Sequence, residues 1–174
     1  MTKAGKYTFQ EQKAIGDLAE DTVEKYLSEM VKVEKVDSLK EQLKGIDFIL
    51  DLEGDKKKVE VKIDNICHRN GRYFLEIELV KANGQHSKDG WVHTTASDFL
   101  FLLVGRTNTL RIVKPEEIRK NLVRWRRAYG IRECYNKSGY SSIGVCVPFV
   151  YIKGLTVDLA SDCEQTVIDF LKNN

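Results

Sequence analysis

Residues 45–64 read GIDFILDLEGDKKKVEVKID, and this stretch organises the interpretation of the whole chain. Two runs that alternate apolar and polar residues, Gly45–Leu52 and Val59–Asp64, flank a Glu53-Gly54 break and three lysines. Alternation over four to eight residues on both sides of such a break is typical of a β-hairpin. We therefore predict two antiparallel strands joined at the Glu-Gly pair.

The apolar positions also predict the register of this hairpin. Centring the turn on the Glu-Gly pair places Phe48 opposite Val59. The same register places Asp47 opposite Glu60, with Lys62 on their face of the sheet. A slip of one residue would turn the apolar side chains to the wrong face, so the pattern favours this register alone.

The polar face of the predicted hairpin indicates a site for a divalent cation. Directly opposed residues have Cβ atoms about 5 Å apart, and two carboxylates at that distance repel each other. Mg²⁺ is held in proteins by one or two carboxylates and keeps other positions for water and substrate oxygens. Lys62 adds a positive charge that could hold an attacking water or a phosphate. The alternative is a hairpin with a solvated charged face.

A helix precedes the hairpin and carries a further candidate residue. Thr8 and Glu11 match a capping box, which predicts a helix from there to about Met30. Glu20 lies in the middle of this helix, four residues after Gly16 and therefore on the same side. Glu20 is either a site residue or an ordinary surface glutamate.

The rest of the chain predicts an α/β (α+β) protein in the order α-β-β-β-β-β-β-α-β-α. Further strands are expected at 31–37, 73–80, 99–104, 109–113 and 145–153. Further helices are expected at 115–129 and from a capping box at 161–164 to about Leu171. Loops or irregular segments are expected at 38–44, 81–90 and 131–144. We expect a single domain over residues 1–174, with its core at about 8–130 and a C-terminal extension at about 131–174.

Charge is unevenly distributed along the chain. The net charge is +2, but residues 106–137 contain ten Lys and Arg against three Asp and Glu, which leaves the remainder mildly acidic. The helix predicted at 115–129 carries most of this block and includes Trp125. Its basic residues are Arg119, Lys120, Arg124, Arg126 and Arg127. This composition indicates nucleic-acid phosphates as a partner, and the alternative is a solvated amphipathic helix.

Several classes of protein are disfavoured by composition. No apolar run approaches the roughly 20 residues that span a bilayer, and the first residues lack the apolar core of a signal peptide. We therefore expect a cytoplasmic protein without a membrane partner. The four cysteines form no Cys-x-x-Cys pair, and with three histidines the spacing does not support a zinc site.

Taken together, three segments resemble the PD-(D/E)XK nuclease superfamily, which has the restriction-endonuclease-like fold. They are Gly16-Asp17-Leu18-Ala19-Glu20, Gly45-Ile46-Asp47-Phe48 and Val59-Glu60-Val61-Lys62. The stretches at 73–76, 90–91 and 96–99 are similar to a phage or bacterial endonuclease or resolvase-like branch, so the resemblance covers about residues 9–104. Ile46 stands where the superfamily pattern has proline.

The resemblance implies a restriction-endonuclease-like central mixed β-sheet flanked by helices, and it implies roles for the polar residues. Asp47 and Glu60, with the backbone carbonyl of Val61, would hold Mg²⁺ or Mn²⁺. Glu20 would complete the site directly or through water, and Glu76 would be a further outer ligand.

The implied activity is that of a metal-dependent endonuclease acting on DNA, with RNA left open as a substrate. Lys62 would orient the attacking water and stabilise charge on the phosphate in the transition state. A Holliday-junction-resolvase-like or repair nuclease is a subtype that would require a homodimer. The alternative of another class is a catalytically inactive DNA-binding or assembly module that retains the fold.

Overall fold

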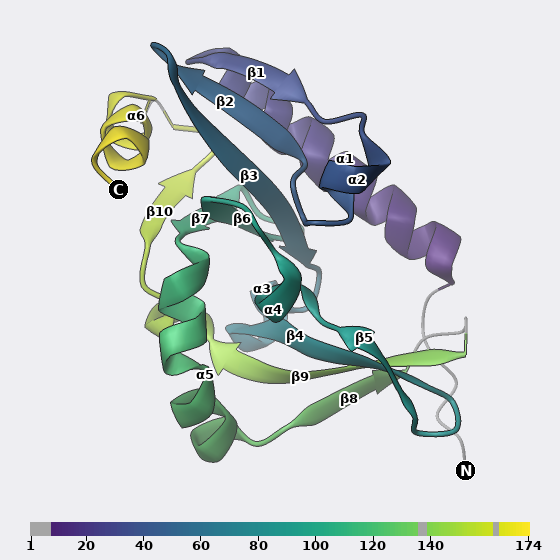
Figure 1. Ribbon diagram of the computed structural model, residues 1–174. Coiled ribbons are helices and arrows are strands. Elements are labelled where there is room, and N and C mark those ends of the chain that lie inside the picture. The colour runs from purple at the N-terminus through teal and green to yellow at the C-terminus, as the bar shows by residue number, and fades with distance from the viewer. Residues whose placement is uncertain (1–7, 136–138, 162–163) are drawn as a thin grey trace.

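The computed structural model describes residues 8–135, 139–161 and 164–174, which form two β-sheets flanked by helices (Figure 1). The helices are α1 (Phe9–Ser28), α2 (Leu39–Gln42), α3 (Cys67–Asn70), α4 (Trp91–Thr94), α5 (Pro115–Tyr129) and α6 (Glu164–Asn173), with a 3-10 turn at Phe149–Tyr151. The strands are β1 (Lys32–Lys35), β2 (Phe48–Leu52), β3 (Asp55–Asp64), β4 (Arg72–Lys81), β5 (His86–Asp89), β6 (Phe99–Val104), β7 (Thr109–Val113), β8 (Arg132–Tyr135), β9 (Tyr140–Pro148) and β10 (Leu155–Asp158).

The larger sheet is mixed, as predicted. Its order is β1-β2-β3-β6-β7-β10, in which β3 and β6 run parallel and the other neighbours antiparallel. The second sheet has the order β5-β4-β9-β8 and is antiparallel throughout. The predicted α/β class with a mixed sheet between helices is confirmed, while the strand expected at 73–80 belongs to the second sheet as β4.

The hairpin at the centre of the sequence forms with the expected turn. Its ladder runs from the Leu52–Asp55 pair to the Phe48–Val59 pair, as predicted. Glu53 and Gly54 have φ values of 61° and 96°, which are typical of the type I′ turn that suits the twist of a two-residue hairpin. The ladder does not continue to Asp47, whose N–H instead donates to the carbonyl of Val59 at 2.8 Å.

Apolar side chains fill both faces of the larger sheet. Val59 and Val61 on β3 pack with Phe99 and Phe101 on β6 beneath α1 and α6. The alternate β6 residues, with Leu100 among them, pack against β4, β9, α4 and α5. β6 is buried at every position, which explains why its sequence is a continuous apolar run.

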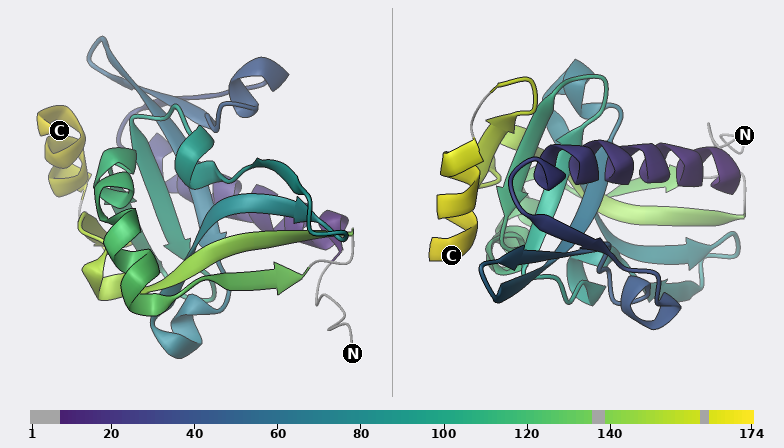
Figure 2. Two further views of the ribbon diagram at one scale, coloured as in Figure 1. Left: turned by 60° about the horizontal axis from the view of Figure 1, so that its bottom comes forward. Right: turned by 90° about the horizontal axis from the view of Figure 1, so that it is seen from above.

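Helices and the second sheet therefore sandwich the larger sheet in layers. α1 and α6 contribute to the same apolar cluster, and α6 stands beside β10 at one edge while α1 extends towards the opposite edge (Figure 2). The second sheet, α4 and α5 contribute to the other cluster. The capping box of Thr8 and Glu11 is present, and α1 ends at Ser28, slightly earlier than predicted.

Several elements differ from the sequence-based expectation. The segment expected to be a loop at 38–44 contains α2, the one at 81–90 contains β5, and the irregular segment at 131–144 contains β8 and the start of β9. The strand expected at 145–153 stops at Pro148, and β10 follows at Leu155–Asp158. β5 and β8 are exposed at every residue, so neither has the apolar alternation by which a strand is found.

The C-terminal segment contributes to both apolar clusters, through Val145 and Val147 on one face and Val167 and Leu171 on the other. Across the described residues, no helix is long and apolar enough to cross a membrane. Cys67, Cys134 and Cys146 are free thiols, and the fourth cysteine lies outside the described residues.

Candidate active site

β3 presents opposite chemistry on its two faces. Its pairing with β6 aligns Glu60 with Leu100 and Lys62 with Leu102, so both charged side chains lie on the face that meets the second sheet. Glu60 is only 3 % exposed. A carboxylate buried to this degree requires a compensating partner, because burial of an unpaired charge is costly.

Lys62 supplies part of that compensation. Its Nζ lies 2.6 Å from Oε1 of Glu60, and its side chain is 29 % exposed. Oε2 of Glu60 is buried and has no hydrogen-bond partner. One carboxylate oxygen is thus paired with an ammonium, and the other is buried without a hydrogen-bond partner.

Gly45 makes the space that the Glu60 carboxylate occupies. A Cβ at this position would lie 2.7 Å from the carboxylate carbon and from both of its oxygens. Gly45 also has a φ of +69°, in the left-handed region that favours glycine. The segment that leads to Asp47 therefore passes directly over the carboxylate of Glu60.

Asp47 is anchored beside this pair. It follows the buried Ile46 and precedes β2, and its Oδ2 accepts a hydrogen bond from the N–H of Val61 at 2.7 Å. The bond fixes the Asp47 carboxylate against the strand that carries Glu60 and Lys62. The structure thus brings Asp47 to these two residues, although by a side-chain bond to β3 rather than by the predicted cross-strand pairing.

The pKa values of the pair reflect their shared environment. Burial raises the pKa of Glu60, and the nearby ammonium of Lys62 partly offsets this rise. Burial acts to lower the pKa of Lys62, but the carboxylates of Glu60 and Asp47 outweigh burial and hold it above the usual value. Lys62 is therefore a cation at neutral pH.

Glu20 approaches the same group from α1. Burial, followed by the charge of Asp47, raises the pKa of Glu20 to about 6. The ammonium of Lys35 opposes this rise, with its Nζ 4.0 Å from Oε2 of Glu20. Lys35 also lies 3.2 Å from Asp21. Lys35 thus offsets the negative charge of Glu20 and Asp21 on α1, a role that was not predicted from the sequence.

Glu76 lies on β4 of the second sheet. Its charge is among those that raise the pKa of Lys62. Its Oε2 accepts a hydrogen bond from the hydroxyl of Ser142 at 2.7 Å. Glu76 is thus held by the second sheet, and it acts on Lys62 less strongly than Glu60 and Asp47 do.

A small polar cluster supports the site from the loop before β6. Thr95 and Ser97 are buried, and their hydroxyl oxygens lie 2.8 Å apart. The Thr95 hydroxyl also donates to the carbonyl of Gly45 at 3.4 Å, and it acts to lower the pKa of Glu60. Sequence analysis did not identify Gly45, Thr95 or Ser97 as site residues, because small polar residues before a strand are typical of an ordinary loop.

Of the predicted nucleic-acid-binding residues of α5, Arg119 contacts the loop that supports the site, and α1 and α5 lie on opposite sides in Figure 1. Arg119 donates to the carbonyls of Val92 at 2.9 Å and Thr95 at 2.6 Å, so it supports the Thr95 loop. Lys120 pairs with Glu117 at 2.8 Å. Arg124, Arg126 and Arg127 are exposed, and the last two line an open hollow of about 300 Å³ with Val123 and Ile131.

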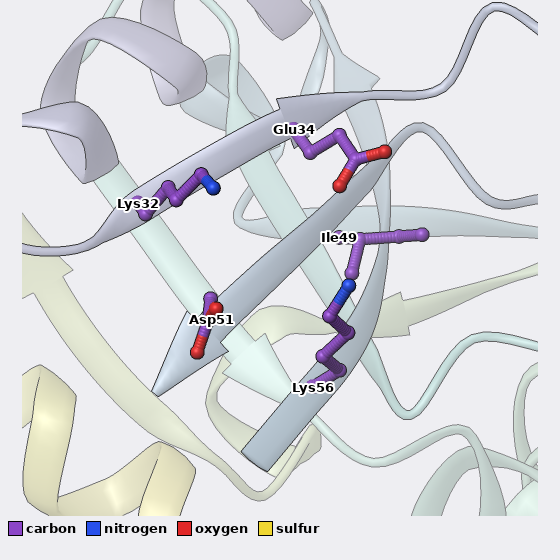
Figure 3. A pocket seen from close by; sticks show the side chains of 5 residues that line it. All are labelled: Lys32, Glu34, Ile49, Asp51 and Lys56. Atoms are coloured by element: carbon purple, nitrogen blue, oxygen red, sulfur yellow. The ribbon is translucent and has the colours of Figure 1, made fainter. Parts of the chain in front are cut away.

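A second hollow lies on the outer part of the sheet face that carries Glu60. Lys32, Glu34, Ile49, Asp51 and Lys56 surround it (Figure 3). Its volume is about 20 Å³, which is room for roughly one water molecule. It is too small for an organic ligand.

The candidate site offers oxygen donors, which are the ligands that a hard cation takes. Mg²⁺ takes oxygen ligands, and Glu60 offers a buried oxygen without a hydrogen-bond partner next to Asp47. Within residues 8–135, 139–161 and 164–174, no three His, Cys, Asp or Glu side chains converge closely enough to hold a metal ion by themselves. A cation here would therefore need backbone or water oxygens to complete its ligands.

Comparisons with known proteins place the chain in no named family. No family model matches it. No curated protein matches it either. Among solved structures, it is similar to a bacterial homing endonuclease, with 20 % identity and a TM-score of 0.47 over 60 % of this chain and 69 % of the other. At these values we draw no conclusion about activity from the similarity.

Proposed function

We propose that the protein is a metal-dependent endonuclease that hydrolyses DNA phosphodiester bonds. The observation that carries this proposal is the buried Glu60 oxygen without a hydrogen-bond partner, beside Asp47 and Lys62. Glu20 adds a third carboxylate from a separate helix. The charge of Asp47 acts to raise the pKa of both Glu20 and Glu60, and a divalent cation would relieve this repulsion.

The resident cation of this proposal is Mg²⁺ or Mn²⁺. Asp47, Glu60 and the backbone carbonyl of Val61 would hold it, with Glu20 bound directly or through water and Glu76 as a further outer ligand. When bound, such an ion lowers the pKa of a coordinated water and neutralises charge on the scissile phosphate. Asp47 is already fixed for this role by the Val61 N–H.

Lys62 contributes a positive charge rather than a proton acceptor, because the surrounding carboxylates raise its pKa. In this position it would orient the attacking water and stabilise the charge that develops on the phosphate oxygens. Its Nζ is held 2.6 Å from Oε1 of Glu60, which fixes the ammonium beside the proposed metal ligand. Glu60 thus has two roles, as a metal ligand and as the partner that positions Lys62.

The direct test replaces the ligands without changing their size. Asp47→Asn and Glu60→Gln should abolish Mg²⁺-dependent cleavage of a panel of linear, nicked, forked and four-way DNA. Asp47→Ala and Glu60→Ala should have the same effect. Glu34→Gln is a matched control, since Glu34 is an exposed carboxylate on β1 outside the site. Thermal unfolding should show that each variant remains folded. Undiminished cleavage by either ligand variant would contradict the proposal.

A catalytically inactive DNA-binding or assembly module is the second candidate. It is favoured by the close Lys62–Glu60 ion pair and by the Asp47–Val61 bond, which satisfy much of the site without a metal. Calorimetric titration with Mn²⁺ separates the two candidates. Binding that is abolished in Glu60→Gln supports the nuclease, and no binding supports the module.

The nature of the substrate and the assembly state belong to the same proposal. The phosphodiester chemistry is common to DNA and RNA, so the cleavage panel includes an RNA duplex of the same sequence. A resolvase-like subtype requires a homodimer, which sedimentation of the protein with and without four-way DNA would detect.

A further inference from the structure

We propose that Lys58 and Lys56 form a track for the phosphates of one DNA strand, leading along β3 to the candidate active site. This inference rests on the proposed function and identifies residues that would hold its substrate. Neither lysine was singled out from the sequence, where the run Lys56–Lys58 is typical of a turn.

The first support is alternation along β3. Residues two apart on a strand point to the same face. Lys56 and Lys58 therefore share the face of Glu60 and Lys62, whereas Lys57 shares the face of Val59. The ladder agrees with this assignment, since Lys56 pairs with Asp51 and Lys58 with Ile49, both on the outer face of β2.

The second support is the fixed position of Lys58. Its N–H donates to Oδ2 of Asp98 at 2.7 Å, and its carbonyl accepts from the N–H of Asp98 at 2.8 Å. These bonds hold the β3 backbone two residues before Glu60. The Asp98 carboxylate bonds to this backbone N–H rather than to the lysine ammonium, so the exposed side chain of Lys58 is left for an external anion.

The third support is the distribution of ion pairs within the run of lysines. Lys57 pairs with Asp55 at 3.1 Å, and its side chain is 20 % exposed. For Lys56 and Lys58, both exposed, no described carboxylate lies within 4.0 Å of the ammonium. The lysines on the face of the site are thus the unpaired members of the run among the described residues.

The carboxylates near each lysine indicate which of the two should bind phosphate more strongly. Two acidic groups lie near Lys58: Asp98, whose carboxylate bonds to the Lys58 backbone N–H, and Glu41, which pairs with Lys44 at 2.7 Å. Lys56 stands closer to acidic groups, because Asp51 lies opposite it and Glu34 lines the same hollow (Figure 3). We therefore expect Lys58, next to the site, to bind phosphate more strongly than Lys56.

The spacing of the row fits a polynucleotide. Side chains on one face of a strand recur about every 6.6 Å. A DNA strand carries one phosphate per nucleotide, so a strand that follows β3 would place phosphates along the row of Lys56 and Lys58 and continue past the buried Glu60 to Lys62. A small anion would gain nothing from such a row.

The experiment removes one positive charge at a time from adjacent residues. Lys56→Gln, Lys58→Gln and the double variant are compared with Lys57→Gln, which removes the same charge from the opposite face. Fluorescence anisotropy measures binding of a labelled DNA duplex in EDTA, where cleavage cannot occur, across a series of salt concentrations.

The expected result is a loss of affinity that depends on the face of the strand. Each neutralised phosphate contributes about 0.9 to the slope of log affinity against log salt, which corresponds to about eightfold in affinity at 0.1 M salt. Affinity should fall by about this factor in Lys58→Gln, by the same factor or less in Lys56→Gln, and little in Lys57→Gln. Lys88→Gln on β5 serves as the charge control if Lys57→Gln unfolds.

Two results would overturn the track, and they separate it from the proposed function. Equal losses of affinity in Lys57→Gln and Lys58→Gln, with Mg²⁺-dependent cleavage retained, would mean that binding follows net charge alone. Suppose that Lys56→Gln and Lys58→Gln, but not Lys57→Gln, weaken binding of an RNA duplex and leave binding of DNA unchanged. That result would overturn the choice of DNA. If the unmodified protein binds neither DNA nor Mn²⁺, the proposed function fails and the track with it.

Discussion

The β2–β3 site and helix α5 are both rich in charge, yet they use charge differently. In the site, Glu60, Lys62 and Asp47 are held against one another by burial and by short hydrogen bonds. On α5, Arg124 and Arg127 are exposed, and Arg119 is tied to backbone carbonyls. The contrast shows that charges clustered in the sequence need not meet in the fold, whereas Asp47, Glu60 and Lys62 are brought together from two segments of the chain.

The largest effect should come from filling the space over the Glu60 carboxylate. Gly45→Ala places a methyl group 2.7 Å from that carboxylate and forces alanine into a left-handed conformation, which together should cost about 3 kcal/mol and abolish cleavage. Gly16→Ala is the matched control, because its Cβ meets nothing within 4 Å in the interior of α1. It should stabilise the fold by about 1 kcal/mol. Urea unfolding measures both, and equal stability of the two variants would break the contrast.

Within α5, Arg119 should differ from its neighbours in stability. Arg119→Ala removes two charged donors from the carbonyls of Val92 and Thr95, and we expect stability to fall by about 2 kcal/mol. Arg124→Ala should change stability by less than about 0.5 kcal/mol, since the residue is exposed. Thermal unfolding of the two variants tests this, and an unaffected Arg119→Ala would show that the bonds to the Thr95 loop are dispensable.

Removal of the Glu20 charge should stabilise the fold, and only at neutral pH. The pKa of Glu20 is raised from 4.5 to about 6, so the folded state disfavours the ionised form. The resulting cost is absent below about pH 4.5 and reaches its full value, up to about 2 kcal/mol, above pH 6. Glu20→Gln should therefore be more stable than the parent at pH 7.5 and equal to it at pH 4.5, as measured by urea unfolding in metal-free buffer.

Asp21→Asn is the control for this pH effect. It removes a carboxylate from the same helix, but Asp21 is 65 % exposed and pairs with Lys35, so it should give no stabilisation at pH 7.5. A Glu20→Gln variant that is less stable than the parent at pH 7.5 would mean that Glu20 stabilises the fold through Lys35.

The smallest effect on stability, with a measurable effect on binding, is expected for the exposed α5 arginines. Charge reversal at Arg124 and Arg127 should weaken DNA affinity and lower the salt slope by about 0.9 for each phosphate that the helix no longer neutralises. Fluorescence anisotropy across a salt series measures this slope. An unchanged slope would show that α5 does not bind the DNA backbone, and it would leave the β3 face as the candidate for DNA.

The hairpin and its charged face were predictable because strand alternation couples neighbouring positions. Once Phe48 and Val59 must both be buried, Glu60 and Lys62 must share the other face. The role of Gly45 could not be predicted in this way. A glycine before a strand is common, and its meaning depends on which side chain later lies beneath it.

The second sheet was not predicted for a related reason. β8 is a four-residue strand without a buried side chain, and it is defined by its pairing with β9. β10, at the edge of the larger sheet, is equally short, and Val157 is its one buried residue. A strand that depends on a partner remote in sequence carries little signal of its own. The same holds for the side chain of Arg119, because its role depends on backbone carbonyls that are remote in sequence.

The parallel pairing of β3 with β6 has a consequence for how the molecule folds. Parallel strands need a crossover connection, and here residues 65–98 form it and contain β4, β5 and two short helices. Closing so long a connection has an entropic cost that local contacts do not repay, which places this topology among the slower-folding ones. We therefore expect Glu60 and Lys62 to reach their final surroundings late in folding, after the β2–β3 hairpin has formed.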